Sequence, residues 1–179
     1  MINNQLIDPS SIVVIGGSNN VRKPGGKIIK SIKEGGFDKE LYVVNPNEQR
    51  VQGLKCFQSV SELPRTDLAI LVIPALKCLP VINELIEEKD TKAFIILSAG
   101  FSEAGTEGIE QENKIVERIN KAKGCLIGPN CIGILNKNYA GIFTTPVPPF
   151  DKNGCDLISS SGATAVFIME AGIGLGLKF

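Results

Sequence analysis

The chain has 179 residues, 43% of them hydrophobic, which is enough for one complete domain and part of a second. Its 19 Lys and Arg residues balance its 19 Asp and Glu residues, so charge gives no reason to expect nucleic acid or an anionic membrane as a partner. The sequence contains no histidine, which excludes a Ser-His-Asp triad, a Cys-His pair and a phosphohistidine on this chain.

The amino terminus lacks the charged start and apolar stretch of a signal peptide. No apolar run approaches the roughly 20 residues that a membrane-spanning helix needs. We therefore expect a cytoplasmic protein without a membrane partner. The cysteines form no C-x-x-C pair, so we expect most of them to be small buried residues rather than metal ligands. They are Cys56, Cys78, Cys125, Cys131 and Cys155.

Short apolar runs recur along the chain, each continuous rather than alternating, as is typical of strands buried on both faces of a parallel sheet. They lie at 12–15, 41–44, 68–73, 93–97, 125–127 and 156–159. Helical patterns lie between them, at 27–34, 79–89, 107–123 and 163–171. This alternation predicts an α/β, doubly wound parallel sheet whose ligands bind at the carboxyl ends of the strands.

A proline-rich stretch at 144–154 cannot continue a helix or a central strand and is interpreted as a linker. It separates a Rossmann-like domain at 1–143 from one further strand and helix at 155–179. One strand and one helix cannot form a core, so this unit either adds to the first sheet or begins the next domain of a longer protein. We favour the second alternative.

The turn after the first strand, Gly-Gly-Ser-Asn-Asn, is a candidate phosphate site. Glycines let the backbone approach a phosphate, and the amides of the following helix turn can point at it. Ser18 and Asn19 offer side-chain donors, and Arg22 and Lys23 add charge. The spacing is not G-x-G-x-x-G and no P-loop lysine follows, so a plain tight turn is the alternative.

The turn after the second strand is Asn45-Pro46-Asn47-Glu48. An NAD-binding fold places an acidic residue at the end of this strand to hold a ribose. Glu48 lies three residues past that position and is a poor substitute. The turn therefore lowers the odds of a dinucleotide ligand.

The remaining turns carry weaker signals. Val72, Ile73 and Pro74 form either an apolar wall for a base ring or a plain strand end. The next turn, Ser98-Ala99-Gly100, leaves space and free amides at the end of its strand.

The fifth turn contains Asn130, which offers hydrogen-bond donors and acceptors in a rigid turn. Glu103 is more simply a solvated loop carboxylate than a base, and Cys131 has no base beside it to make it a nucleophile. Ser161 and Gly162 open the last helix, as a second anion site or as an ordinary serine cap.

Six segments together resemble one family in order and spacing, over essentially the whole chain. They are Val14-Ile-Gly-Gly-Ser18, Val44-Asn-Pro-Asn47, Gly53-Leu-Lys-Cys56, Asp67-Leu-Ala-Ile-Leu-Val-Ile-Pro74, Ile96-Leu-Ser-Ala-Gly-Phe101 and Gly128-Pro-Asn-Cys-Ile-Gly133. The chain resembles the CoA-binding domain of the NDP-forming (ADP-forming) acyl-CoA synthetases, or acetate–CoA ligases, which are related to the succinyl-CoA synthetase α subunit. Any one of these segments is weak evidence for the family, but the whole series in this order is specific to it.

The resemblance implies that the ligand is coenzyme A. Its phosphates would lie over the first turn and the helix start, and its nucleotide end would border Pro46. The adenine or pantetheine would follow the third and fourth turns, with the thiol near Asn130. The implied contacts are Gly16, Gly17, Ser18, Asn19, Arg22, Gly26, Pro46, Val72, Ile73, Pro74, Ser98, Ala99, Gly100 and Asn130, with Ser161 and Gly162 for a phosphate.

The family implies a ligase that interconverts acyl-CoA, ADP and phosphate with an acid, CoA and ATP. A phosphohistidine, an ATP-grasp partner and the ATP, ADP and Mg²⁺ all belong to parts that this chain does not contain. The last unit resembles the start of the flavodoxin-like ligase domain. This chain alone is therefore expected to bind CoA without catalysing the reaction and to contain no catalytic residue.

The sequence departs from the succinyl enzyme at Glu48, where that enzyme has a lysine that contacts CoA, and near Val166, where it has a tyrosine. Both departures favour the acetate-type branch. One alternative is a CoA-sensing module of a protein acetyltransferase or a stand-alone CoA-binding protein. Another is an NAD(P)-binding oxidoreductase. A free edge of the predicted sheet also allows the chain to form a homo-oligomer.

Overall fold

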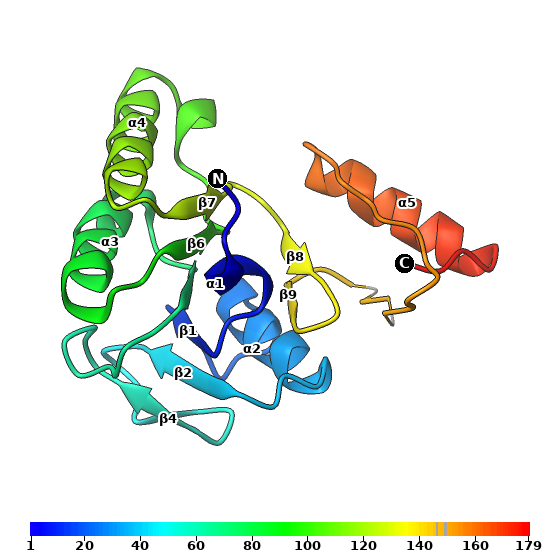
Figure 1. Cartoon of the computed structure of the whole chain (residues 1–179), viewed down its shortest axis with the longest axis horizontal. Helices are drawn as coiled ribbons and strands as arrows, with labels where there is room; N and C mark the ends of the chain where they lie inside the picture. The colour runs from blue at the N-terminus through cyan, green and yellow to red at the C-terminus, as the bar shows by residue number, and fades with distance from the viewer. Residues whose placement is uncertain (146, 149) are drawn as a thin grey trace.

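A computed structural model describes residues 1–145, 147–148 and 150–179. Its centre is a seven-stranded sheet in the order β3-β4-β2-β1-β5-β6-β7, parallel throughout except between β3 and β4 (Figure 1). A short antiparallel hairpin, β8–β9, lies beside it. The strands are β1 (Ser11–Ile15), β2 (Glu40–Val44), β3 (Arg50–Val51), β4 (Leu54–Phe57), β5 (Leu68–Leu71), β6 (Ala93–Ile96), β7 (Cys125–Ile127), β8 (Gly133–Leu135) and β9 (Ala140–Ile142).

Helices cover both faces of the sheet, which confirms the doubly wound α/β prediction. In β1, Ile12 and Val14 join the core under α2, whereas Val13 and Ile15 join the core under α3 and α4. Continuous apolar strands arise because both faces need apolar side chains. The helices are α1 (Asn4–Ile7), α2 (Pro24–Glu34), α3 (Ala75–Lys89), α4 (Thr106–Lys121) and α5 (Gly162–Gly174), with a 3₁₀ turn, η1 (Ser102–Ala104).

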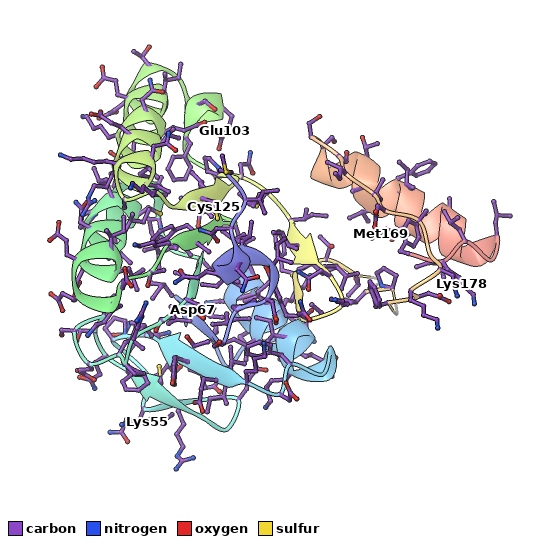
Figure 2. The ribbon with its side chains drawn as sticks, in the orientation of Figure 1. Lys55, Asp67, Glu103, Cys125, Met169 and Lys178 are labelled. Carbon is purple, nitrogen blue, oxygen red and sulfur yellow. The ribbon has the colours of Figure 1, made fainter. Side chains whose placement is uncertain are left out.

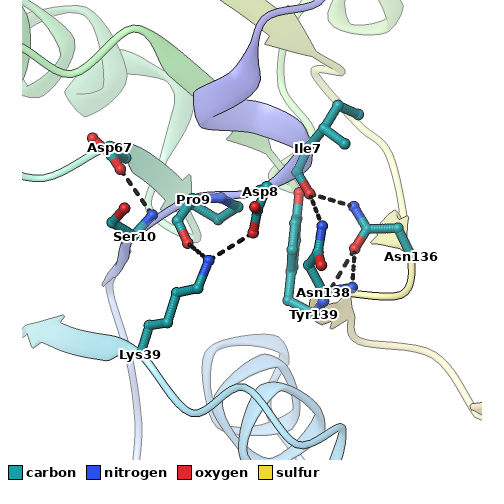
Figure 3. A network of polar contacts seen from close by, with 9 residues as sticks. All are labelled: Ile7, Asp8, Pro9, Ser10, Lys39, Asp67, Asn136, Asn138 and Tyr139. Carbon is teal, nitrogen blue, oxygen red and sulfur yellow. Dashed lines mark hydrogen bonds and ion pairs between the residues drawn. The ribbon is translucent and has the colours of Figure 1, made fainter.

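The β8–β9 hairpin and the amino-terminal segment fasten each other at the amino ends of the strands (Figure 3). The buried Tyr139 hydroxyl donates to Leu6 O at 2.8 Å, and the side-chain amides of Asn136 and Asn138 donate to Ile7 O. Asp8, the residue after Ile7, forms an ion pair with Lys39, whose Nζ lies 2.6 Å from Asp8 Oδ1. This network leaves the carboxyl ends of the strands free for a ligand.

The last apolar run is the one strand prediction that the structure contradicts. Residues 156–159 form no strand, although α5 follows as expected. A strand needs a neighbour to accept and donate its backbone hydrogen bonds, and none of the described residues supplies one. Instead, the amides of Asp151 and Cys155 donate to Phe179 O and Lys178 O.

Part of the predicted linker at 144–154, residues 146 and 149, lies outside the described residues. No described residue of this stretch belongs to a helix or strand. In the described residues, no helix is both long enough and apolar enough to cross a membrane.

Candidate functional site

The turns at the carboxyl ends of β2, β1, β5, β6 and β7 lie side by side, because these strands are neighbours in the sheet. Backbone hydrogen bonds join one turn to the next: Gly16 N donates to Val44 O and Val72 N to Ile15 O, both at 2.9 Å. Asn130 N donates to Ser98 O at 3.0 Å. The structure thus places the predicted contacts from all five turns along one edge, which we call the carboxyl edge.

The glycine turn at 16–20 presents unpaired amides at this edge. Among the described residues, the backbone N–H groups of Gly17, Ser18 and Asn19 have no hydrogen-bond acceptor. Successive free amides in a tight turn form an anion-binding concavity. The first turn of α2 behind them has no side-chain cap. Pro24 at N1 has no N–H, and Gly26 N donates to Lys23 O at 3.0 Å. Among the described residues of this turn, Gly25 therefore carries the amide that has no acceptor and is available to an anion.

Close packing of α2 on the glycine turn requires glycine at two positions. A Cβ on Gly25 would collide with the carbonyl oxygen of Gly16, and one on Gly26 would lie 3.0 Å from Ser18 O and closer still to Asn20 O. Gly16 itself has a φ of +88°, which favours glycine. The predicted role of Gly26 at the helix start therefore has a steric basis.

The side chain of Asn19 is not the free donor that the sequence suggested. Its Nδ2 donates to Arg50 O at 2.9 Å and to the Glu48 carboxylate at 3.1 Å. Its Oδ1 accepts from Gln52 N at 2.8 Å. Only the backbone amide of Asn19 remains for a ligand. The Ser18 hydroxyl accepts from Asn20 N at 3.1 Å and keeps its proton to donate.

The residue that follows β2 is Asn45, an amide rather than an acid. Asn45 Nδ2 donates to Gly17 O at 2.8 Å, so this residue supports the glycine turn. Glu48 is held by Asn19, and Pro46 is exposed beside them. Arg22 and Lys23, the two predicted positive residues near the glycine turn, are both exposed.

The middle of the carboxyl edge is apolar. Val72 and Ile73 are half-buried and Pro74 is exposed, while Ser98 is half-buried next to exposed Ala99 and Gly100. These side chains can support a ring or an alkyl chain, but they offer few polar contacts. A ligand bound here would be oriented mainly from the ends of the edge.

Glu103 lies in η1, after the carboxyl end of β6 (Figure 2). Its carboxylate accepts from Gly100 N at 2.5 Å. That hydrogen bond is the main cause that lowers the pKa of Glu103 below its usual value, and a carboxylate with a lowered pKa is a poor general base. The exposed side chain fits the interpretation as a solvated loop carboxylate.

Asn130 and Cys131 close the far end of the edge. Asn130 is exposed, with a left-handed backbone at φ +54°. The Cys131 thiol faces inward and donates to Ile96 O at 3.4 Å. Burial raises the pKa of this thiol, so it is not activated as a nucleophile.

The second candidate anion site lies near Asn130. Ser161 is the N-cap of α5, and its hydroxyl accepts from Thr164 N at 3.3 Å. A Cβ on Gly162 would lie 2.5 Å from Ile132 Cγ2, so α5 begins against the segment that follows Asn130. The cap geometry is the ordinary one, and phosphate binding here stays a prediction.

Gln52 is the residue that sequence reasoning missed. It lies between β3 and β4 and donates from its side chain to Ser18 O and Gly26 O, at 3.0 and 2.9 Å. The Gln-Gly pair signals a turn, but nothing in the sequence indicates contacts with residues about 30 positions away.

Comparison with protein families finds a match to the family described as CoA binding domain over residues 10–137. The alpha subunit of acetate–CoA ligase [ADP-forming] II from Pyrococcus furiosus is 41% identical over 169 residues, which cover 92% of this chain and 35% of the relative. Acetate–CoA ligase [ADP-forming] II from Archaeoglobus fulgidus is 35% identical over 167 residues, which cover 92% of this chain and 25% of the relative.

Among solved structures, PH0766 from Pyrococcus horikoshii OT3 superposes with a TM-score of 0.87 at 35% identity. The match covers 98% of this chain and 40% of that protein. The chain therefore spans between about a quarter and two fifths of the longer proteins that it matches.

Proposed function

The chain belongs to the CoA-binding domain family, and on this basis we propose that it binds coenzyme A along the carboxyl edge. The pyrophosphate would rest on the free amides of Gly17, Ser18 and Asn19, with Arg22 adding charge. The adenine or pantetheine would follow Val72–Pro74 and 98–100. The thiol end would lie near Asn130.

The observation that carries this proposal is a set of free backbone amides at 17–19 beside the end of β2, where Asn45 stands in place of an acid. Three consecutive N–H groups suit a diphosphate. One oxygen of the Glu48 carboxylate accepts from Asn19, and Asn45 at the strand end donates to Gly17 O. A dinucleotide ribose would find an amide instead of an acid at the end of β2, whereas coenzyme A needs no acid there.

We further propose that the chain is the CoA-binding portion of an ADP-forming acyl-CoA synthetase, of the acetate type. Both relatives named above are ADP-forming acetate–CoA ligases, which supports this proposal. Because this chain has no histidine, the phosphohistidine must come from another part of the enzyme, and ATP, ADP and Mg²⁺ would bind to an ATP-grasp domain or subunit. We expect the reaction to take place in the cytoplasm. This chain by itself would bind CoA without turnover.

Calorimetric titration with CoA, dephospho-CoA and NAD tests the binding site. We expect saturable binding of CoA and no heat with NAD. Arg22→Ala should weaken CoA binding by about fivefold, and the loss should shrink at high salt. Lys137→Ala, on the exposed turn of the β8–β9 hairpin at the opposite end of the strands, is the matched control and should bind like the parent. Absent CoA binding, or tighter binding of NAD, would overturn the proposal.

A further inference from the structure

The β3–β4 hairpin is fastened to the glycine turn by two side-chain amides. The side-chain amide of Asn19 pairs with the edge of β3 as a neighbouring strand would. Its Nδ2 donates to Arg50 O, and its Oδ1 accepts from Gln52 N. Gln52 reaches back in the other direction and donates to Ser18 O and Gly26 O. The two carbonyl groups belong to the glycine turn and to the first turn of α2, so one side-chain amide joins both halves of the candidate anion site.

The hydrogen bond to Ser18 O fixes a peptide plane. In a trans peptide, the carbonyl of one residue and the N–H of the next point in opposite directions. Because Ser18 O is turned toward Gln52, the N–H of Asn19 is directed away from the hairpin. That N–H has no partner among the described residues and is one of the three amides proposed to hold the diphosphate.

The backbone of Gln52 is itself held in place. Its φ of +49° is in the left-handed region, where a residue other than glycine is strained. Its carbonyl oxygen accepts from Lys33 Nζ on α2 at 2.8 Å. The two hydrogen bonds with Asn19 hold the hairpin where the Gln52 side chain can reach the two carbonyl groups, whereas the exposed Lys33 adds stability to the hairpin without contacting the glycine turn.

We propose that Gln52 is a positioning residue for the diphosphate of coenzyme A, and this inference rests on the proposed function. It acts through Ser18 and Gly26, keeping their carbonyl oxygens turned away from the bound anion and the Asn19 amide turned toward it. Without Gln52, the Ser18–Asn19 peptide is free to rotate, and part of the binding energy goes into ordering it. The effect of Gln52 is thus on affinity, through preorganisation of the turn.

The test compares Gln52→Met with Lys33→Met. Met has nearly the length of Gln but no donor, so the variant removes the two hydrogen bonds to Ser18 O and Gly26 O with little change in packing. Lys33→Met removes the hydrogen bond to Gln52 O and loosens the same hairpin without altering the contacts to the glycine turn. Calorimetry with CoA and with dephospho-CoA would be paired with thermal unfolding and amide NMR of both variants.

We expect Gln52→Met to bind CoA and dephospho-CoA about tenfold more weakly, by the same factor, because both ligands carry the diphosphate. The amide signal of Asn19 should broaden or shift in the free variant. Lys33→Met should bind within about twofold of the parent, although its unfolding temperature falls to a similar extent.

Equal affinity in Gln52→Met and the parent would overturn the role of Gln52 while leaving CoA binding intact. The same loss of affinity in both variants would also overturn it, since general loosening of the hairpin would then explain the effect. A parent protein that binds no CoA would instead sink the proposed function.

Discussion

The cysteines show how burial decides the chemistry of single residues in this chain. Burial raises the pKa of the Cys56, Cys125 and Cys131 thiols. It raises the pKa of Cys78, a fully buried residue of α3, to about 12. Since the thiolate is the reactive form, all four are poor nucleophiles at neutral pH, and they serve as packing residues.

Cys78 predicts a specific loss of stability in alkali. The unfolded thiol ionises above pH 9, whereas the folded thiol stays neutral up to about pH 12. The contribution of Cys78 is therefore fully present below pH 9 and declines as pH rises from 9 to 12. Cys78→Ala should remove about 1.4 kcal/mol of the stability lost between pH 8 and pH 10. Urea unfolding at the two pH values measures this difference, and an unchanged pH dependence would contradict it.

The β1–turn–α2 unit is the element on which the candidate site depends. The turn and the helix can approach each other only because Gly25 and Gly26 lack side chains. A methyl group at either position would push α2 away from the turn or force the carbonyl groups of the turn outward. The separation of the two parts of the anion site is thus set by backbone packing as well as by Gln52.

Gly26→Ala should lower the free energy of unfolding by about 2 kcal/mol and weaken CoA binding, because the added Cβ meets the carbonyl oxygens of Asn20 and Ser18. Gly174→Ala in α5 is the matched control, since a Cβ there has nothing within 4 Å. It should leave both properties nearly unchanged. Urea unfolding and calorimetry give the two readouts. A Gly26→Ala protein with parental affinity would show that the turn tolerates a wider separation.

Five of the central strands were predictable, because burial on both faces makes their sequences continuously apolar. The hairpins β3–β4 and β8–β9 were not, since their strands have two to four residues and several of their side chains are partly exposed. The run at 156–159 was predicted wrongly because its apolar residues have no neighbouring strand among the described residues.

The placement of the five candidate turns at one edge was predictable, since the carboxyl ends of neighbouring parallel strands meet at the same edge of a sheet. The roles of single side chains inside the site were less accessible. The Asn19 side chain and Gln52 act through contacts over about 30 residues, and such pairing is set by the position of a hairpin that the sequence does not reveal.

At the scale of the whole molecule, the chain consists of a large part that contains both core clusters and a small part around α5. Among the described residues, the two core clusters and the apolar residues packed against them include nothing beyond Phe143. Helix α5 stands apart from the sheet layers (Figure 1). It begins against Ile132 and buries Ala165 and Met169. This arrangement supports the proposed division into a domain at 1–143, a linker at 144–154 and the start of a further unit.

Several large apolar side chains on and around α5 are exposed: Ile158 at 97%, Phe167 at 71% and Leu175 at 89%. Such a surface favours self-association in water. A chain shortened to residues 1–143 should therefore sediment as a monomer at concentrations where the 179-residue chain associates. Phe167→Ser in the longer chain should reduce the association and serves as the matched comparison.

The shortened chain should also keep its unfolding temperature within a few degrees, because both core clusters stay intact. It should bind CoA within about twofold of the longer chain, since the amides at 17–19 and the apolar wall at 72–74 lie within it. Sedimentation velocity, thermal unfolding and calorimetry on the two lengths measure the three quantities. A shortened chain that fails to fold would show that the segment after Phe143 belongs to the same cooperative unit, and the proposed boundary would have to move past α5.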